Sequence, residues 1–410
     1  MNKIAIINCG DNGSTGKICT SLMQYYSSNN FDVLFACHNV KEDLLNDNRV
    51  YQIKENKIAF FLNKVLCRLD GSDGFRNKAA TKKLIKKLDV FSPGIVHLHN
   101  LHGHYINIEL LLNFIFKKNI KIIWTLHDCW AFTGRCPYFD ITKCSQWKNG
   151  CNKCPKQALH DYPAAYLFNR PRYYFNKKNE LFSKFKKNLL FVTPSNWLFN
   201  LLGSSILKEF NRAVINNGIN NAVTSIQYDS IKLNCDYNKI ILICVAYPFS
   251  KTKGIDHVIK LSKCLDYSKF ELIVVGLKEK QKCLFDKRIK SVGYISNPNT
   301  MVFLFGCADY FINPTLEDNF PTVNIESLKA GTPVITFETG GSPEVLTDKT
   351  GIVVERDNFE KMLDAIKNIS KKTDFIKKEC IERSMIYTEE KMCSNYLDII
   401  QKLLEIKETD

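Results

Sequence analysis

Residues 309–346 constrain the fold more than any other part of the sequence. The apolar run 310–312 is followed by an acidic, proline-containing turn, and a second apolar run, 334–337, lies near the end of the segment. The residues between the runs have a helical pattern that Pro321 can open, because proline lacks an N–H that the first helical turn would leave unpaired. Gly331 is a typical helix stop. The segment therefore predicts a strand, a helix and a second strand.

A strand, a helix and a strand in this order are typical of a parallel α/β sheet, which binds ligands at the carboxyl ends of its strands. The first loop contains Asp318, and Glu326 follows on the helix. Helix N-termini attract phosphate, and carboxylates accept hydrogen bonds from hydroxyl groups. Each acid alone is read more simply as a solvated charge near a helix start. The two together favour a site for a sugar nucleotide.

The residues EDNFPTVNIE, followed by AGTPVITFETGGSPEVL, resemble the signature of the retaining GT-B glycosyltransferases of family 4. In that signature a carboxylate, seven residues and a glutamate precede a GTPV strand and a GG-P-E turn. Asp318 takes the place of the first carboxylate, usually Glu, and Glu326 that of the second, whereas Glu317 lies one position too far away. The resemblance implies that Asp318 contacts the donor sugar and Glu326 the nucleotide ribose. We place Asn319 and Phe320 in the same donor site.

The length of 410 residues and an apolar fraction of 45% are enough to fill two hydrophobic cores. The resemblance implies an α/β protein of the GT-B type, with two Rossmann-like domains whose parallel sheets face across a cleft. We expect an acceptor-side domain at 1–222 with a cysteine-rich insert at 128–163, and a nucleotide-sugar domain at 238–388. A polar linker at 221–237 separates them, and a C-terminal helix within 389–410 crosses back to the first domain.

A glycine-rich turn follows the first apolar run. It differs from a P-loop because five residues, not four, separate Gly10 from Gly16, and because Ile18 follows Lys17 where Ser or Thr is required. Such a turn can cradle phosphate with its backbone amides, or it can serve only to pack a helix on a strand. The family resemblance places it beside the donor diphosphate. The donor-binding residues predicted there are Gly13, Ser14, Thr15 and Gly16.

Three histidines lie near the ends of two predicted strands. His97 and His99 share one face of the first strand, and His127 ends the second. Most such histidines are hydrogen-bonded core or rim residues, although strand ends also hold site residues. In the resembled family a histidine at the place of His127 contacts the donor sugar. The predicted catalytic residues are therefore His127, Asp318 and Glu326.

The loop YPFSKTKG of the second domain corresponds to one that brings an arginine and a lysine to the donor diphosphate in the resembled family. Lys253 matches the lysine, but the arginine is missing. Tyr247 stands near its place, and Lys251 is a possible substitute. The sequence contains no Asp-x-Asp motif, so we expect no cofactor for catalysis and neutralisation of the phosphates by protein groups.

The predicted insert is rich in cysteine. Cys136, Cys144, Cys151 and Cys154 are separated by seven, six and two residues. The pair Cys151 and Cys154 has the spacing of a zinc half-site, whereas the other two gaps are loose for a zinc knuckle. The chain has 16 cysteines and no recognisable export signal, so we expect reduced thiols. A structural zinc ion held by the four cysteines is the interpretation we favour over free thiols.

The net charge of +15 is confined to the first half of the chain, where residues 1–222 carry 31 Lys and Arg against 15 Asp and Glu. A one-sided basic surface favours an anionic partner such as a membrane, or it serves only solubility. The basic helix at 78–87 is a candidate for membrane contact, although the segment taken alone favours a plain solvated helix. No apolar run is long enough to span a bilayer. We expect a cytoplasmic protein, peripheral on the inner face of the plasma membrane.

The resemblance implies transfer of a hexose from a nucleotide-diphosphate donor to an acceptor hydroxyl with retention of configuration. It suggests capsule, O-antigen, lipopolysaccharide or exopolysaccharide assembly and a lipid-linked saccharide acceptor. One alternative is a GT-B epimerase or phosphorylase, although a phosphorylase needs a pyridoxal lysine site that is not recognisable. The other is a nucleic-acid-binding protein that uses the basic half. No nucleic-acid-binding module is visible, so we expect no nucleic-acid partner.

Overall fold

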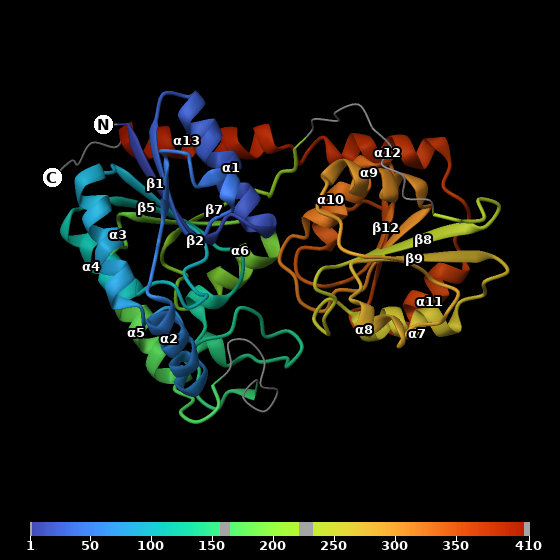
Figure 1. Ribbon diagram of the computed structural model, residues 1–410, viewed down its shortest axis with the longest axis horizontal. Coiled ribbons are helices and arrows are strands. Elements are labelled where there is room, and N and C mark those ends of the chain that lie inside the picture. Colours follow the sequence, from blue (N-terminus) through green and yellow to red (C-terminus); the bar gives the residue numbers. More distant parts are fainter. Residues whose placement is uncertain (1, 156–164, 221–232, 406–410) are drawn as a thin grey trace. The chain divides into compact units, whose positions relative to one another are not determined.

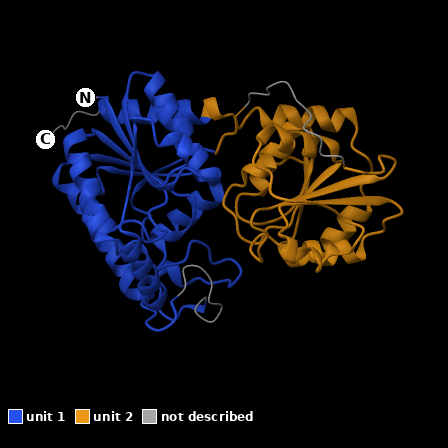
Figure 2. Ribbon diagram, viewed as in Figure 1, with its two compact units in different colours: residues 1–216, 392–410 blue, residues 217–391 orange. Residues whose placement is uncertain are grey.

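The computed structural model describes residues 2–155, 165–220 and 233–405 of the chain. They form two compact units (Figure 2). Unit 1 comprises Met1–Asn216 and Met392–Asp410, and unit 2 comprises Asn217–Lys391. Most of the expected linker, residues 221–232, and the end of the expected insert, residues 156–163, lie outside the described residues.

Unit 1 is built on a seven-stranded parallel sheet with strand order β3-β2-β1-β4-β5-β6-β7 (Figure 1). Its inner strands are apolar runs without polar alternation, as expected for strands that are covered on both faces. The strands are β1 (Lys3–Gly10), β2 (Asp32–Asn39), β3 (Val50–Gln52), β4 (Ile95–Leu98), β5 (Lys121–Thr125), β6 (Leu189–Thr193) and β7 (Asn211–Val214).

Helices cover both faces of this sheet. One core cluster joins the sheet to α1 (Gly13–Ser28) and to α13 (Glu389–Glu405), whose Tyr396 is fully buried and bonds to Thr125 at 2.8 Å. The C-terminal helix therefore packs on unit 1. The other cluster involves helices on the opposite face. The remaining helices of unit 1 are α2 (Lys57–Asp70), α3 (Lys78–Phe91), α4 (Ile108–Lys117), α5 (Pro171–Ser183) and α6 (Asn196–Gly203).

Unit 2 has a six-stranded parallel sheet with order β10-β9-β8-β11-β12-β13, again between two layers of helices. Its strands are β8 (Ile240–Val245), β9 (Phe270–Val275), β10 (Lys290–Val292), β11 (Tyr310–Asn313), β12 (Val334–Phe337) and β13 (Gly351–Val354). Its helices are α7 (Ile255–Cys264), α8 (Glu279–Lys282), α9 (Pro298–Cys307), α10 (Thr322–Lys329), α11 (Phe359–Lys367) and α12 (Asp374–Ser384).

The predicted strand, helix and strand are β11, α10 and β12. The two strands pair in parallel, with Phe311 opposite Val334, and Pro321 caps α10 at its N-terminus. Gly331 has a φ of 74°, the left-handed conformation that ends a helix. The α/β fold of two Rossmann-like domains with parallel sheets is thus confirmed.

The strand order of each sheet reverses between two neighbouring strands. This switch point lies between β1 and β4 in unit 1, and between β8 and β11 in unit 2. Ligands of open parallel sheets bind outside the carboxyl ends of the strands at such points. The two switch points are therefore where functional side chains are expected.

Candidate functional site

Two loops meet at the switch point of unit 2. The loop after β8 and the loop after β11 are joined through the Thr252 carbonyl, which accepts hydrogen bonds from Leu316 N at 2.8 Å and Thr315 Oγ1 at 3.2 Å. Gly254 has a φ of 74°, and a Cβ there would lie 2.0 Å from the Pro314 carbonyl oxygen. Only glycine allows this approach. The two loops therefore form one rigid edge.

An ion pair connects these loops. The Lys253 ammonium lies 2.5 Å from Asp318 Oδ2, and Asp318 Oδ1 accepts the backbone N–H of Asn319 at 2.9 Å. The side chain of Lys253 is 41% exposed and that of Asp318 is 16% exposed. An ammonium group has three N–H donors, and Asp318 occupies one of them. Lys253 can therefore hold this loop and still donate to a phosphate.

A third loop, which follows β12, packs against the backbone of Asp318 and Asn319. Gly341 N donates to Asn319 O at 2.7 Å, and a Cβ on Gly340 would lie 1.8 Å from the Asp318 carbonyl oxygen. Thr339 and Ser342 flank these glycines. Their buried hydroxyl oxygens have no hydrogen-bond partner among the described residues. Gly340, the first glycine of the sequence motif, is thus needed to let this loop approach the Asp318 backbone.

The other predicted donor residues of unit 2 differ in what they can offer. Glu326 lies on α10, about one turn beyond its first residue, and is partly exposed. Asn319 is buried, and its backbone bonds to the Asp318 carboxylate and to Gly341 of the loop after β12. The ring of Phe320 is also buried, edge-on to Tyr387 at 5.6 Å between centroids. The ring of Phe320 therefore belongs to the core, and its backbone is the part that can face a donor.

An aromatic pair lies near the strand ends, at the place of the missing arginine. Tyr247 follows β8, and its ring centroid lies 4.3 Å from that of Tyr294, which follows β10. The two residues are 58% and 60% exposed. Lys251 is also exposed. Sequence reasoning could not predict this ring contact, because Tyr247 and Tyr294 are far apart along the chain.

At the switch point of unit 1, the predicted glycine-rich turn is the start of a helix. α1 begins at Gly13, so Ser14, Thr15 and Gly16 lie in its first turn and not in a loop before it. A Cβ on Gly16 would lie 2.1 Å from the carbonyl carbon of Asp11, so only glycine fits there. The first backbone N–H groups of a helix have no intrahelical partner and attract anions. This end of α1 can therefore bind phosphate.

The three predicted histidines form two distinct contacts on β4 and β5. His97 is fully buried, and its Nε2 lies 2.9 Å from Thr125 Oγ1. His99 Nδ1 lies 3.0 Å from His127 Nε2. Burial is the main cause that lowers the pKa of His127 to about 4. His127 is therefore neutral at pH 7 and partly exposed, whereas His97 belongs to the core.

A second polar pair lines the same small cavity as His99 and His127. His102 Nε2 lies 2.7 Å from Asp128 Oδ2. Burial opposes the charge on both groups, but their mutual attraction outweighs it, so the pKa of His102 is raised and that of Asp128 is lowered. Their mutual attraction therefore favours the ionised form of each group. Sequence reasoning missed it, although Asp128 directly follows His127.

The buried histidines predict that acid weakens unit 1. Burial lowers the pKa of His97 from about 6.5 to about 3, so between these values the unfolded chain binds a proton that the folded chain does not. Stability is therefore present above the unfolded pKa and is lost as pH falls. The titration of His97 alone should lower the free energy of unfolding by about 2 kcal/mol when the pH falls from 7 to 5.

Urea unfolding at the two pH values tests this prediction on the native protein and on His97→Gln. All four tryptophans, Trp124, Trp130, Trp147 and Trp197, lie in unit 1, so their fluorescence follows this unit alone. The variant should lose less stability on acidification, because the other titrating groups are common to both proteins. An equal loss in the two proteins would contradict the assignment.

Comparison with known proteins indicates the activity class of the chain. Residues 227–384 match the family model described as glycosyl transferases group 1. The putative colanic acid biosynthesis glycosyl transferase WcaC of Escherichia coli (strain K12) is 25% identical over 373 residues, which cover 88% of this chain and 89% of that protein. The chain is a glycosyltransferase.

Solved structures agree with this glycosyltransferase fold. Sucrose-phosphate synthase from Thermosynechococcus elongatus aligns with a TM-score of 0.70 at 14% identity, over 99% of this chain and 100% of that one. HepE from Anabaena in complex with UDP-glucose aligns with a TM-score of 0.63 at 12% identity, over 98% and 99% of the two chains. In the described part of this glycosyltransferase, no helix combines the length and the apolar character needed to cross a bilayer.

Proposed function

We propose that this glycosyltransferase moves a hexose from a nucleotide-diphosphate donor to an acceptor hydroxyl with retention of configuration. The observation that carries the proposal is the Lys253–Asp318 ion pair at the switch point of unit 2, within the residues that match the glycosyl transferases group 1 model. At this point the Asp318 carboxylate can accept hydrogen bonds from sugar hydroxyl groups. The remaining N–H groups of Lys253 can donate to a phosphate.

Each polar group has a role in this proposal. Lys253 and the first-turn amides of α1 stabilise the negative charge that develops on the departing diphosphate. Asp318 accepts hydrogen bonds from the donor sugar, Glu326 accepts them from the ribose, and His127 contacts the donor sugar as a neutral group. The exposed rings of Tyr247 and Tyr294 offer a stacking surface for the nucleotide base.

The test is release of nucleoside diphosphate from a panel of UDP-, GDP- and ADP-linked hexoses, with and without a saccharide acceptor. One donor should be consumed faster when acceptor is present, and NMR of the product should show the anomeric configuration of the donor. Isomerisation of the sugar nucleotide without release of diphosphate would favour the epimerase alternative. An inverted product would reject retention while leaving glycosyl transfer intact.

The printed name of WcaC, a putative colanic acid biosynthesis glycosyl transferase, favours a surface polysaccharide as the pathway. We infer a lipid-linked saccharide acceptor, which would require the enzyme to work at the inner face of the plasma membrane. The basic excess of residues 1–222 suits an anionic bilayer. Two helices of unit 1 are candidates for the contact, and they differ in where their apolar side chains lie.

The first candidate is α3, the basic helix expected from sequence. Its Leu84 and Leu88 are fully buried in the core, so they are not available to lipid. Its lysines are exposed and form a solvated face of a core helix. They are Lys82, Lys83, Lys86 and Lys87. α3 can therefore attract a membrane by charge but cannot insert into it.

The second candidate is α2, which exposes an apolar face. The segment 166–168 extends this face, because Tyr166 N donates to Arg68 O at 2.8 Å and Leu167 N donates to Leu69 O at 3.0 Å. We name these residues the α2 face: Ile58, Phe61, Leu62, Val65 and Leu66, exposed by 38–71%, with Tyr166, Leu167 and Phe168, exposed by 47–64%.

The charged residues around the α2 face indicate what kind of surface it binds. On α2 itself the basic residues are Lys57, Lys64 and Arg68, whereas the only acid is Asp70, which is paired with Arg76 at 2.6 Å. Apolar side chains flanked by basic ones are typical of helices that lie in the headgroup region of anionic membranes. We therefore propose the α2 face as the surface that docks on the bilayer.

A further inference from the structure

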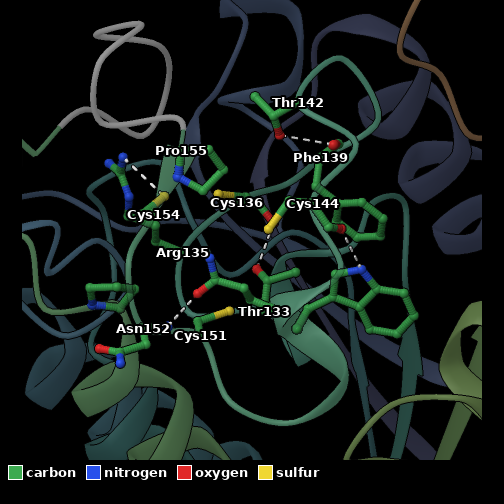
Figure 3. Close-up of a pocket in the computed structure, with 13 residues that line it drawn as sticks. Thr133, Arg135, Cys136, Phe139, Thr142, Cys144, Cys151, Asn152, Cys154 and Pro155 are labelled. Atoms are coloured by element: carbon green, nitrogen blue, oxygen red, sulfur yellow. Dashed lines mark hydrogen bonds between the residues drawn. The ribbon is translucent and has the colours of Figure 1, made fainter.

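The segment between β5 and α5 brings the four cysteines of the insert to one pocket. Cys136, Cys144, Cys151 and Cys154 all line it, although they come from separate turns (Figure 3). None of these four cysteines forms a disulfide, and all are partly exposed. We propose that they bind one zinc ion, which fixes this segment on unit 1 and takes no part in the transfer reaction.

Hydrogen bonds in the pocket suit sulfur ligands. Gly134 N lies 3.1 Å from Cys151 Sγ and donates to it, and Arg135 Nη2 donates to Cys154 Sγ at 3.7 Å. Zinc binds cysteine as a thiolate, which is a stronger acceptor than a thiol, and N–H donors around the sulfurs orient such ligands. The two sulfurs of the closely spaced pair thus already have the outer donors that a zinc site uses.

Packing holds the remaining backbone of the pocket in place. Trp147 is buried against Phe132 and Phe139, and its Nε1 donates to the Cys144 carbonyl at 3.1 Å. A Cβ on Gly134 would lie 2.5 Å from the Pro171 carbonyl oxygen, so the turn fits against the start of α5 only as glycine. The buried Trp147 therefore positions Cys144. Gly134, which lies against the start of α5, positions Cys151.

Buried positive charge favours a tetrathiolate over neutral thiols. Arg135 is 2% exposed, and Lys178 is 1% exposed near Cys151 and Cys136. Lys178 Nζ donates to Trp130 O at 2.5 Å, which is a neutral acceptor. Zinc with four thiolates carries two negative charges, which basic side chains beside the ligands would offset.

The segment also has little regular secondary structure of its own. Between Thr133 and Pro155 its regular structure, among the described residues, is the short 3-10 helix Gln146–Lys148. Loops of this length without their own secondary structure are uncommon in compact domains, and metal binding can provide the missing folding energy. The four cysteine sulfurs of the pocket do not all lie within 4.8 Å of one another. Elsewhere in unit 1, the ligand atoms of Cys67, Asp73 and His104 do lie that close together. Zinc binding therefore requires rotation of the cysteine side chains.

Metal analysis of the full chain, purified without added metal or chelator, tests the proposal. We expect about one zinc per chain, released when a mercurial reagent blocks the thiols. Cys151→Ser and Cys154→Ser should lose most of this zinc, and the tryptophan fluorescence of unit 1 should report a lower melting temperature. The matched controls are Cys264→Ser and Cys283→Ser, which remove exposed thiols in unit 2 and should keep the zinc.

If the cysteine variants fail to fold, the native protein can be tested instead, with cobalt substituted for zinc. Tetrahedral thiolate ligation should then give intense visible absorption and a sulfur-to-cobalt charge-transfer band. Protein free of metal would overturn the proposal, whether its intact mass shows two disulfides or four reduced thiols. Zinc that stays bound in both Cys151→Ser and Cys154→Ser would overturn it too, and Cys67→Ser would then locate the metal at Cys67, Asp73 and His104.

Discussion

Glu326→Gln and Asp318→Asn should each lower transfer at least about 100-fold, because each removes a charged acceptor from the donor site. Both changes keep the shape of the side chain, so the helix start and the loops should remain intact. Asp318→Asn should act mainly on kcat, because Asp318 is proposed to contact the reacting sugar. Glu326→Gln should act mainly on KM for the donor. Initial rates over a range of donor concentrations separate the two effects.

Glu360→Gln is the matched control for these variants. Glu360 is an exposed glutamate of the same unit, paired with Lys260 at 2.8 Å on the surface, and its loss should change neither rate nor stability by more than about 0.5 kcal/mol. Circular dichroism melts establish that all three variants are folded. Near-native rates in folded Asp318→Asn and Glu326→Gln would reject the assignment of both carboxylates.

The ion pair makes Lys253 informative in the same experiment. In the free enzyme Lys253 bonds to Asp318 at 2.5 Å, so Lys253→Met removes a phosphate ligand and also leaves a partly buried carboxylate without its cation. A double variant with Asp318→Asn relieves the second effect but not the first. The coupling between the two substitutions therefore measures how much of the loss is due to the pair itself.

The sequence predicted unit 2 well because the relevant signals are local. The apolar runs that became β11 and β12, and the Pro321 and Gly331 that bound α10, lie within one continuous segment. Asp318 reaches the switch point simply because a loop must follow β11. Its contact with Lys253 needs the additional fact that β8 and β11 are neighbours, which residues 309–346 alone do not specify.

Long-range contacts explain what sequence reasoning missed. His99 meets His127, and His102 meets Asp128, only because β4 and β5 pair side by side. Burial decided other cases. Phe320 has the right place in the motif, but its ring fills the core, and Leu84 and Leu88 of α3 do the same in unit 1. Periodicity predicts that a helix has an apolar face but not what covers that face.

Phe61→Ser with Leu62→Ser should weaken binding to anionic vesicles at least about 10-fold, because burying either side chain in lipid stabilises by ~1.5–3 kcal/mol. The two residues are 64% and 54% exposed in the α2 face, so the substitutions should not disturb the core. Co-sedimentation with vesicles that contain phosphatidylglycerol, compared with pure phosphatidylcholine, measures the effect. Native protein should bind the anionic vesicles and dissociate at high salt.

The lysines of α3 provide the contrasting variant. Glutamate at Lys82, Lys83, Lys86 and Lys87 removes long-range attraction at about 1 kcal/mol per residue near the surface, but it leaves the α2 face intact. This variant should lose affinity at low salt and approach native behaviour at high salt, whereas the Phe61 and Leu62 variant should stay weak at every salt concentration. Loss in the α3 variant alone would move the docking surface to α3. Binding that ignores lipid charge and both sets of substitutions would reject docking on an anionic bilayer and favour a soluble acceptor.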